Sequence, residues 1–236
     1  DDIVFVENDA LGYRVGYLLD EFRFENGFKT KIGKAQFNEM EPKSRRQNRK
    51  WEEARKLAYN GSLQHFLKAL VTDRLNEEGF KVNIIRYDSV TSEYSTPLNP
   101  KPVDEILRVK STENEFLYDL FVEEDIEVTY TNEFESTDYK KRYRSKSSKG
   151  NYKYTDKKAR SSITISDNEK LTSYQIYGVD LADMDLFQKS IIFFEKENLK
   201  IGYPGFFLDQ RAVAFGGWWA WQGFSELLPL DYVPSN

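Results

Sequence analysis

Only one long stretch of this chain, residues 43–80, has the apolar spacing of helices. Its second half begins at Ser62 and continues with apolar residues at steps of three and four, which fall on one face of a helix. These residues are Leu63, Phe66, Leu67, Leu70 and Val71. Ser62 is suited to cap the helix, Gly79 can take the left-handed conformation that ends one, and the Asn-Gly pair before Ser62 is typical of a turn. The spacing therefore predicts a helical hairpin of about residues 44–79.

The first arm of this hairpin, about residues 44–59, has a narrow apolar face made of Trp51, Ala54 and Ala58. A helix with so little apolar surface is expected to lie on the outside of the domain or against another chain. Residues 43–56 also contain seven Lys or Arg against two Asp or Glu. The candidate contacts to a partner in this arm are Arg45, Arg46, Arg49, Lys50 and Trp51.

Strand-type alternation dominates the rest of the sequence. Residues 3–24 are aromatic and β-branched and change phase near Leu18 and Leu19, which predicts two strand pieces with a bulge or a bend between them. An Asn-Gly turn then leads to a return strand over residues 28–37, and residues 126–134 alternate as a half-buried strand. These patterns predict an α+β fold, mainly antiparallel β-sheet with the helical hairpin packed on it, in a single domain over residues 1–236.

A second basic block, residues 140–160, has ten Lys or Arg against one Asp, in a chain whose net charge is −5. Its basic and aromatic residues are interleaved, a pattern that can bind single-stranded nucleic acid and that an exposed β-hairpin also produces. We interpret it as such a hairpin, with its return arm at Ile163 and Ile165, and do not expect nucleic acid as the partner. Both basic blocks can steer anionic partners or hold an acidic surface of the same protein. The candidate partner contacts here are Lys140, Lys141, Arg142 and Arg144.

The chain has no Cys and a single His, His65. Without Cys it cannot form disulfides, thiolate metal sites or cysteine nucleophiles. Ser-His-Asp triads, His-containing zinc sites and most His general bases would all have to use His65. Since His65 lies opposite the Leu63, Leu67 and Leu70 face, we expect it at the solvent or at an interface, and we expect His65→Ala to be mild. No apolar run approaches the roughly 18 residues that cross a bilayer.

Three tryptophans near the C-terminus form a candidate aromatic patch. Trp218, Trp219 and Trp221 follow a Gly-Gly pair, and such rings can stack on sugars or dominate protein contacts. If this segment is a strand, Trp219 and Trp221 point to one face and Trp218 to the other, so at least one ring belongs to the core.

Asp180, Asp183 and Asp185 are the candidate metal ligands, because their oxygens are of the kind that Ca²⁺ or Mg²⁺ accepts. Their spacing lacks the Gly turn and the closing Glu of an EF-hand loop. A solvated acidic turn is the simpler interpretation, so no cofactor is expected beyond this Ca²⁺ option.

Four segments carry a resemblance to a known family. They are ALGYRVGYLLDEF (10–22), RKWEEARKLAYNGSLQHFLKAL (49–70), LNEEGFKV (75–82) and LLPLDYVP (227–234). In this order they resemble the domain that follows the carboxypeptidase-regulatory-like β-sandwich in Gram-negative envelope proteins, the carboxypeptidase-like regulatory domain-containing family. The resemblance implies export, a periplasmic or outer-membrane location, and an upstream sandwich with which Asp1–Glu7 would form a linker or a shared strand. It implies no peptidase activity, since the zinc ligands of such an enzyme are missing.

The sequence therefore favours a non-enzymatic scaffold or interaction module of the cell envelope, an accessory subunit that binds other envelope or outer-membrane proteins. The alternative is a carbohydrate- or cell-wall-binding surface protein that uses the three tryptophans. A third hypothesis is a glycan-degrading enzyme, for which no pair of carboxylates stands out.

Overall fold

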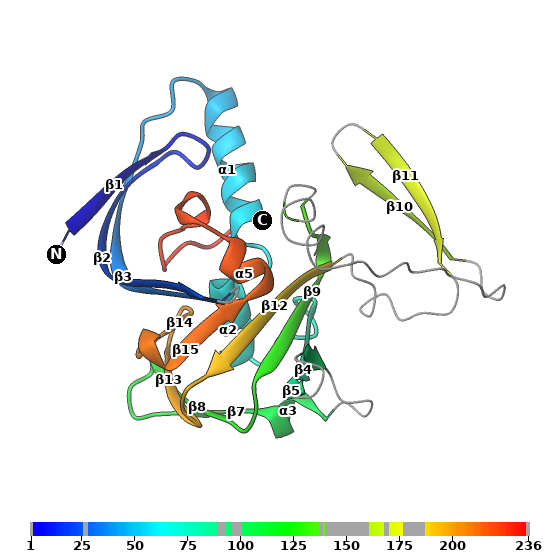
Figure 1. The fold of residues 1–236 in the computed structure, drawn as a ribbon. Helices are drawn as coiled ribbons and strands as arrows, with labels where there is room; N and C mark the ends of the chain where they lie inside the picture. Colours follow the sequence, from blue (N-terminus) through cyan, green and yellow to red (C-terminus); the bar gives the residue numbers. More distant parts are fainter. Residues whose placement is uncertain are drawn as a thin grey trace.

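The computed structural model describes most of the chain. The described residues are 2–25, 28–88, 93–95, 101–136, 139, 161–167, 170–176 and 187–234. Over these residues the protein is mainly antiparallel β-sheet with a few helices, as Figure 1 shows. The predicted α+β fold class is therefore confirmed.

The element bounds are as follows. The strands are β1 (Asp2–Asn8), β2 (Tyr13–Glu25), β3 (Phe28–Glu39), β4 (Phe80–Ile84), β5 (Arg86–Asp88), β6 (Glu93–Ser95), β7 (Leu107–Ser111), β8 (Leu117–Val122), β9 (Ile126–Phe134), β10 (Ser161–Asp167), β11 (Lys170–Ile176), β12 (Phe187–Phe194), β13 (Asn198–Gly202), β14 (Phe206–Phe207) and β15 (Val213–Gly216). The helices are α1 (Arg45–Tyr59), α2 (Leu63–Val71), α3 (Val103–Ile106), η3 (Gln210–Ala212), α5 (Gly217–Trp221) and η4 (Phe224–Glu226).

A seven-stranded antiparallel sheet forms the frame of the molecule, in the order β1-β2-β3-β15-β12-β9-β4. The long strands β2 and β3 bend, so the sheet curves around α5 and the C-terminal segment (Figure 1). A four-stranded sheet, β14-β13-β8-β7, lies below it in that view. The pairs β5-β6 and β10-β11 form separate two-stranded sheets.

The bulge predicted near Leu18 is confirmed. The register between β2 and β3 shifts between Leu19 and Glu21, which leaves Asp20 as the extra residue. Residues 2–8 form β1, which pairs with β2 along its full length. The other edge of β1 pairs with no strand that the structure describes, so the expected linker or shared strand with an upstream domain stays a prediction.

Two apolar clusters hold the elements together. The larger surrounds α2 and includes the fully buried Phe66, Phe80, Ile126 and Ile192 from α2, β4, β9 and β12. The smaller lies between α1, the start of β2 and the C-terminal segment, and its buried residues are Leu11, Tyr13, Val15, Ala58, Tyr59 and Leu228. Helix α1 therefore packs on one cluster and α2 on the other.

Both helices start where the sequence indicated. The Ser44 hydroxyl accepts a hydrogen bond from the Gln47 N–H at 3.2 Å, and the Ser62 hydroxyl accepts one from the His65 N–H at 3.1 Å. Helix α2 ends earlier than expected, at Val71, because Asp73 takes the left-handed conformation with φ of 55°. Gly79, also left-handed with φ of 84°, then ends a series of turns before β4 rather than a helix.

Residues 140–160, the bulk of the expected basic hairpin, lie outside the described part of the chain. Ile163 and Ile165 of its expected return arm lie on β10, which pairs with the following strand, β11. Strand β9 pairs with β12 and β4, which come much later and much earlier in the sequence. Alternation alone identified these strands but carries no information on which distant strand each one joins.

Within the described part of the chain, no helix is both long enough and apolar enough to cross a membrane.

Candidate functional site

The outer face of α1 carries basic side chains without acidic partners. Arg45, Arg46 and Lys50 are exposed, and none of them forms an ion pair with any residue that the structure describes. Arg49 reaches Glu53 at 3.6 Å, but both side chains are exposed, and such a surface pair contributes roughly 0–1 kcal/mol. The first turn of α1 contains no acidic residue. This face is therefore electropositive and open to solvent.

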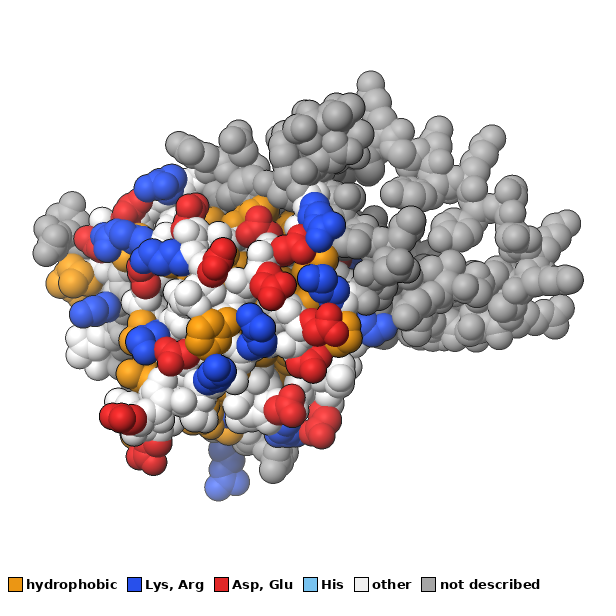
Figure 2. Space-filling model, turned by 90° about the horizontal axis from the view of Figure 1, so that it is seen from below, with side chains coloured by type: hydrophobic (Ala, Val, Ile, Leu, Met, Phe, Trp, Pro, Cys, Tyr) orange, Lys and Arg blue, Asp and Glu red, His pale blue; other side chains and the backbone are white. Residues whose placement is uncertain are grey.

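The basic residues at the other end of the molecule are neutralised locally. On the β8 and β13 strands, Lys200 lies 2.7 Å from Asp119, and close by Lys196 lies 2.5 Å from Asp209. Figure 2, which shows the molecule from below, accordingly has Lys and Arg interspersed with Asp and Glu over the described surface. Lys196 and Lys200 thus differ from Arg45, Arg46 and Lys50, for which no described acidic partner exists.

Helix α1 is fixed to the domain through its inner face, which includes Trp51. The Trp51 ring is 3% exposed, and its indole N–H donates to the carbonyl of Asp9 at 2.7 Å. It lies over Gly12, whose positive φ of 69° brings the backbone so close that a Cβ there would clash with the ring. The structure therefore places Trp51 in the interior and not among the exposed partner contacts with which the sequence grouped it.

Arg55 forms a second attachment between α1 and the β2 end of the sheet. Its Nε donates to the Leu11 carbonyl at 2.7 Å, and its guanidinium lies 4.0 Å from the centre of the Tyr13 ring. Glu39 contacts the same guanidinium at 3.2 Å. With Trp51 and Arg55 held on the inner side, the Arg45, Arg46 and Lys50 side chains project from a fixed helix.

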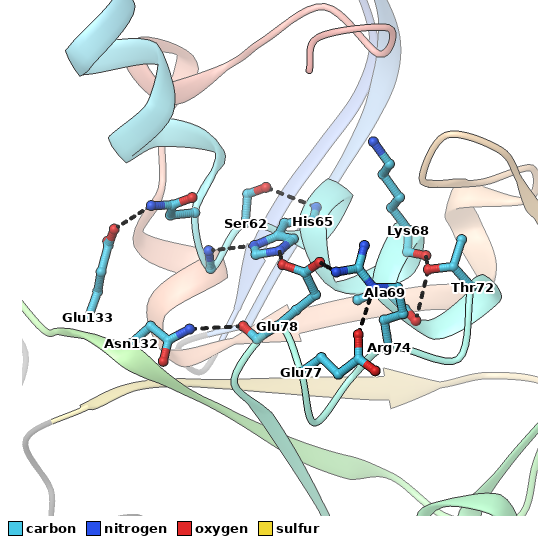
Figure 3. A network of polar contacts seen from close by, with 12 residues as sticks. Ser62, His65, Lys68, Ala69, Thr72, Arg74, Glu77, Glu78, Asn132 and Glu133 are labelled. Carbon is cyan, nitrogen blue, oxygen red and sulfur yellow. Dashed lines mark hydrogen bonds and ion pairs between the residues drawn. The ribbon is translucent and has the colours of Figure 1, made fainter. Parts of the chain in front are cut away.

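His65 is buried, which corrects the expectation that it faces solvent or an interface. Its Nδ1 accepts a hydrogen bond from the Gly61 N–H at 3.2 Å, so the proton of the neutral ring sits on Nε2, which lies 3.2 Å from Glu78 Oε2. Figure 3 shows Glu78 between His65 and Arg74, and Arg74 also bonds Glu77. Burial lowers the pKa of His65 in spite of the Glu78 carboxylate.

Aromatic rings enclose the imidazole and explain its burial. Tyr59 stacks on it with ring centres 4.8 Å apart, and Phe80 and Tyr130 meet it edge-on. Both ring nitrogens are engaged with groups of the protein, so neither is left to accept a proton from a substrate. A histidine bonded to a glutamate is also what an oriented catalytic base would contain. Here the two bonds of His65 connect α2 to the turn at Gly61 and to the turn before β4.

The turn between the two helices is also fixed from the sheet side. The Trp219 indole donates to the Gly61 carbonyl at 2.7 Å. Glu133 accepts hydrogen bonds from Asn60 at 2.9 Å and from Gln188 at 3.1 Å, and burial raises the pKa of Glu133. The role of Glu133 could not be predicted from the sequence. Its partners Asn60 and Gln188 are far from it in the chain, so no local spacing of residues indicates the contact.

The C-terminal tryptophans lie on a short helix, α5, and not on a strand. Trp218 and Trp219 are 8% and 5% exposed, which confirms that at least one ring is core, and Trp221 is half-buried. Tyr139 packs edge-on against Trp218 and Trp221 with ring centres 5.3 and 5.7 Å apart. The predicted separation of Trp219 and Trp221 from Trp218 was wrong because it assumed strand geometry.

The remaining candidates lie outside the described residues. These are Lys140, Lys141, Arg142, Arg144, Asp180, Asp183 and Asp185. Among the residues that are described, no group of three or more His, Cys, Asp or Glu side chains could hold a metal ion.

Comparison of the chain with protein-family models, with curated proteins and with solved structures finds no match in any of the three. The resemblance to the envelope family therefore stays a prediction.

Proposed function

We propose that this domain is a non-enzymatic interaction or scaffold module of the Gram-negative cell envelope. In this proposal it is an exported accessory subunit of an assembly at the outer membrane, in the periplasm or at the cell surface, and it binds an acidic surface of another envelope protein through the outer face of α1. The helical hairpin of about residues 44–79, packed on the sheet, stays part of the prediction, but the proposal needs only α1.

The observation that supports the proposal is the row of Arg45, Arg46 and Lys50 without acidic partners in the described structure, on a helix held rigidly by Trp51 and Arg55. Exposed cations on a fixed helix can meet a complementary surface with little loss of backbone freedom. The outer face offers little apolar surface apart from Leu57, so a polar, charged contact suits it better than insertion into lipid.

The carbohydrate-binding alternative has less support. Two of its three rings, Trp218 and Trp219, are buried, and the Trp219 N–H is already bonded to Gly61. An aromatic platform for sugar needs exposed ring faces. Our proposal therefore rests on α1.

The test is purification of the full-length protein from its native membrane in mild detergent, with identification of co-purifying proteins by mass spectrometry. We expect a defined set of envelope proteins in fixed ratio, and we expect it to be lost in the triple variant Arg45→Glu, Arg46→Glu, Lys50→Glu. The matched control is Arg108→Glu, Lys196→Glu, Lys200→Glu, which makes the same change in charge on residues that already have acidic neighbours. A protein that purifies alone, or a set that persists in the α1 variant, would contradict the proposal.

A further inference from the structure

Strand β1 leaves one edge of the large sheet open. It is the terminal strand in the sheet order, and no described strand pairs with its outer side (Figure 1). Its register with β2 is regular from Asp2 to Asn8, and its sequence, DIVFVEN, contains no Pro and no Lys. Pro and Lys are two of the devices with which proteins block the edge of a sheet, and the charges of β1, Asp2 and Glu7, lie near its ends. An unblocked edge of this length is a template for another strand.

Exposed apolar side chains accompany this open edge. Ile3, Phe5 and Leu18 are 54%, 81% and 37% exposed. The register places Ile3 opposite Leu18 and Phe5 opposite Gly16, so all four positions share one face of the sheet. A Cβ at Gly16 would lie 3.6 Å from the Phe5 ring and 3.8 Å from Ile3, which shows that both side chains lean over this glycine. The open edge and the apolar patch therefore form one surface.

The sequence of β1 is complementary to itself in one antiparallel register. Directly opposed residues in an antiparallel pair point to the same face of the sheet, so a two-fold axis between two β1 strands must pass through a residue position. With the axis at Val4, Ile3 stands opposite Phe5 of the second copy, Val4 opposite Val4, and Asp2 opposite Val6.

The neighbouring registers fit less well. An axis at Phe5 would place Ile3 opposite Glu7, and an axis at Val6 would place Phe5 opposite Glu7. In the Val4 register Glu7 would stand opposite Asp1 at the border of the pair, and its charge is offset by the 2.8 Å ion pair with Arg14. Between Asp2 and Val6 no like charges stand opposite one another, and the exposed Ile3 and Phe5 cover each other.

We propose that a second copy of this chain docks on β1, with the two strands antiparallel about a two-fold axis at Val4. The two seven-stranded sheets then continue into one another, and the Ile3, Phe5 and Leu18 side chains of both copies form one apolar cluster across the axis. This inference goes beyond the proposed function, because it needs no envelope partner and uses a surface distinct from α1.

The chain contains no Cys, so a single introduced thiol reports on the register without background. Opposed residues in an antiparallel pair have Cα atoms about 4.5–5.5 Å apart, within the range that a disulfide spans. Under mild oxidation Val4→Cys should therefore cross-link to itself. Val6→Cys is the matched control, since its two copies would be offset by four residues, or about 13 Å along the strand.

A mixed experiment sharpens the test. Ile3→Cys alone and Phe5→Cys alone should give no dimer, whereas a mixture of the two should give a cross-linked dimer, because Ile3 faces Phe5 across the axis. Self-cross-linking that is strongest at position 5 or 6, or equal at all positions, would overturn the register.

The mass of the unmodified protein in solution tests the association itself. Light scattering behind size exclusion should show a dimer that dissociates on dilution and that Phe5→Glu abolishes. Phe116→Glu, which changes an aromatic residue that is 56% exposed at the turn between β7 and β8, should leave the dimer intact. A monomer at the highest soluble concentration would overturn the proposal, as would capture of a strand from a different protein in place of a second copy.

Discussion

His65 Nε2 and Glu78 Oε2 lie 3.2 Å apart, and through this contact the only histidine of the chain joins helix α2 to the turn that precedes β4. The other ring nitrogen, Nδ1, accepts a hydrogen bond from the Gly61 N–H. A residue that could have been a catalytic base thus has both ring nitrogens occupied by structural bonds.

Replacement of His65 should destabilise the domain. His65→Ala would leave the Gly61 N–H buried without its acceptor and remove a ring that packs against Tyr59, Phe80 and Tyr130. We expect a loss of about 2–4 kcal/mol in the free energy of unfolding, measured by urea denaturation. Lys68→Ala, on the exposed side of the same helix, should stay within about 0.5 kcal/mol. A His65→Ala effect as small as the control would show that the network is dispensable.

The stability of the domain should fall on acidification below about pH 6.5, the ordinary pKa of histidine. Burial lowers the pKa of His65 in the folded state, so between the lowered value and 6.5 the unfolded chain binds more protons, and protons favour unfolding. The groups around the ring include Glu78, Lys68, Tyr59 and Tyr130.

Glu133 has the opposite effect on stability. Burial raises the pKa of its carboxyl in the folded state, so just above pH 4.5 the folded chain binds more protons than the unfolded chain, and acidification favours folding. The contribution of His65 is therefore isolated by comparing unfolding free energies of the wild type and His65→Gln at a series of pH values. The wild type should lose more stability than the variant between pH 7.5 and pH 5.5, and equal slopes would refute a buried neutral histidine.

The short-range features of this fold could be predicted, and the long-range ones could not. The cap at Ser62, the bulge after Leu19 and the strand at residues 126–134 follow from local residue types and spacing. Pairing of β9 with β12 and β4 depends on contacts between distant segments. The burial of His65 is a case of the same kind, because α2 is covered by residues that are remote in the sequence, such as Tyr130 on β9 and Trp219 on α5.

Trp51 should behave as a core residue. Trp51→Ala removes a ring that is 3% exposed together with its bond to the Asp9 carbonyl, and we expect a loss of about 3–5 kcal/mol in the free energy of unfolding. Leu57→Ala on the outer side of α1, where Leu57 is 64% exposed, should change it by less than about 0.5 kcal/mol. Thermal or chemical denaturation distinguishes the two, and a mild effect of Trp51→Ala would return this residue to the list of partner contacts.

The charged form of Lys31 is disfavoured by burial. Its amine lies 4.8 Å from the Phe224 ring centre and 5.3 Å from that of Tyr17, and burial, followed by the nearby Lys29, lowers its pKa to about 8. Lys31→Met should therefore stabilise the domain at pH 7 by about 1 kcal/mol, since a lost cation–π contact offsets part of the relieved charge burial.

Lys31 should also add stability as the pH rises from about 8 towards 10.5, because the unfolded lysine binds more protons over that range. Burial lowers the pKa of Lys29 and raises that of tyrosines such as Tyr13, so these groups contribute to the pH dependence of the wild type and of the variant alike. The contribution of Lys31 is therefore the difference between the wild type and Lys31→Met, and the exposed Lys34→Met should match the wild type. Loss of stability in Lys31→Met at pH 7 would mean that the aromatic contacts outweigh the burial of charge.

The candidate partner surface was only partly readable from the sequence. The narrow apolar face of α1 correctly indicated a helix with an exposed outer side. The Arg49–Glu53 pair follows from i,i+4 spacing on the helix, but the partner of Arg55 depends on where the distant Glu39 lies in the fold. Spacing could not separate Trp51 from its exposed neighbours either, because its burial is set by Gly12 and Asp9 on another element.

The most direct test of the proposed function compares how much partner protein is recovered with the wild type, with the Arg45→Glu, Arg46→Glu, Lys50→Glu variant and with the Arg108→Glu, Lys196→Glu, Lys200→Glu control, at low and at high salt. We expect recovery with the wild type and the control to fall as salt rises, because exposed charges are screened over about 8–10 Å at physiological ionic strength. Recovery with the α1 variant should be low at both salt concentrations. Equal recovery with all three proteins would contradict binding through α1.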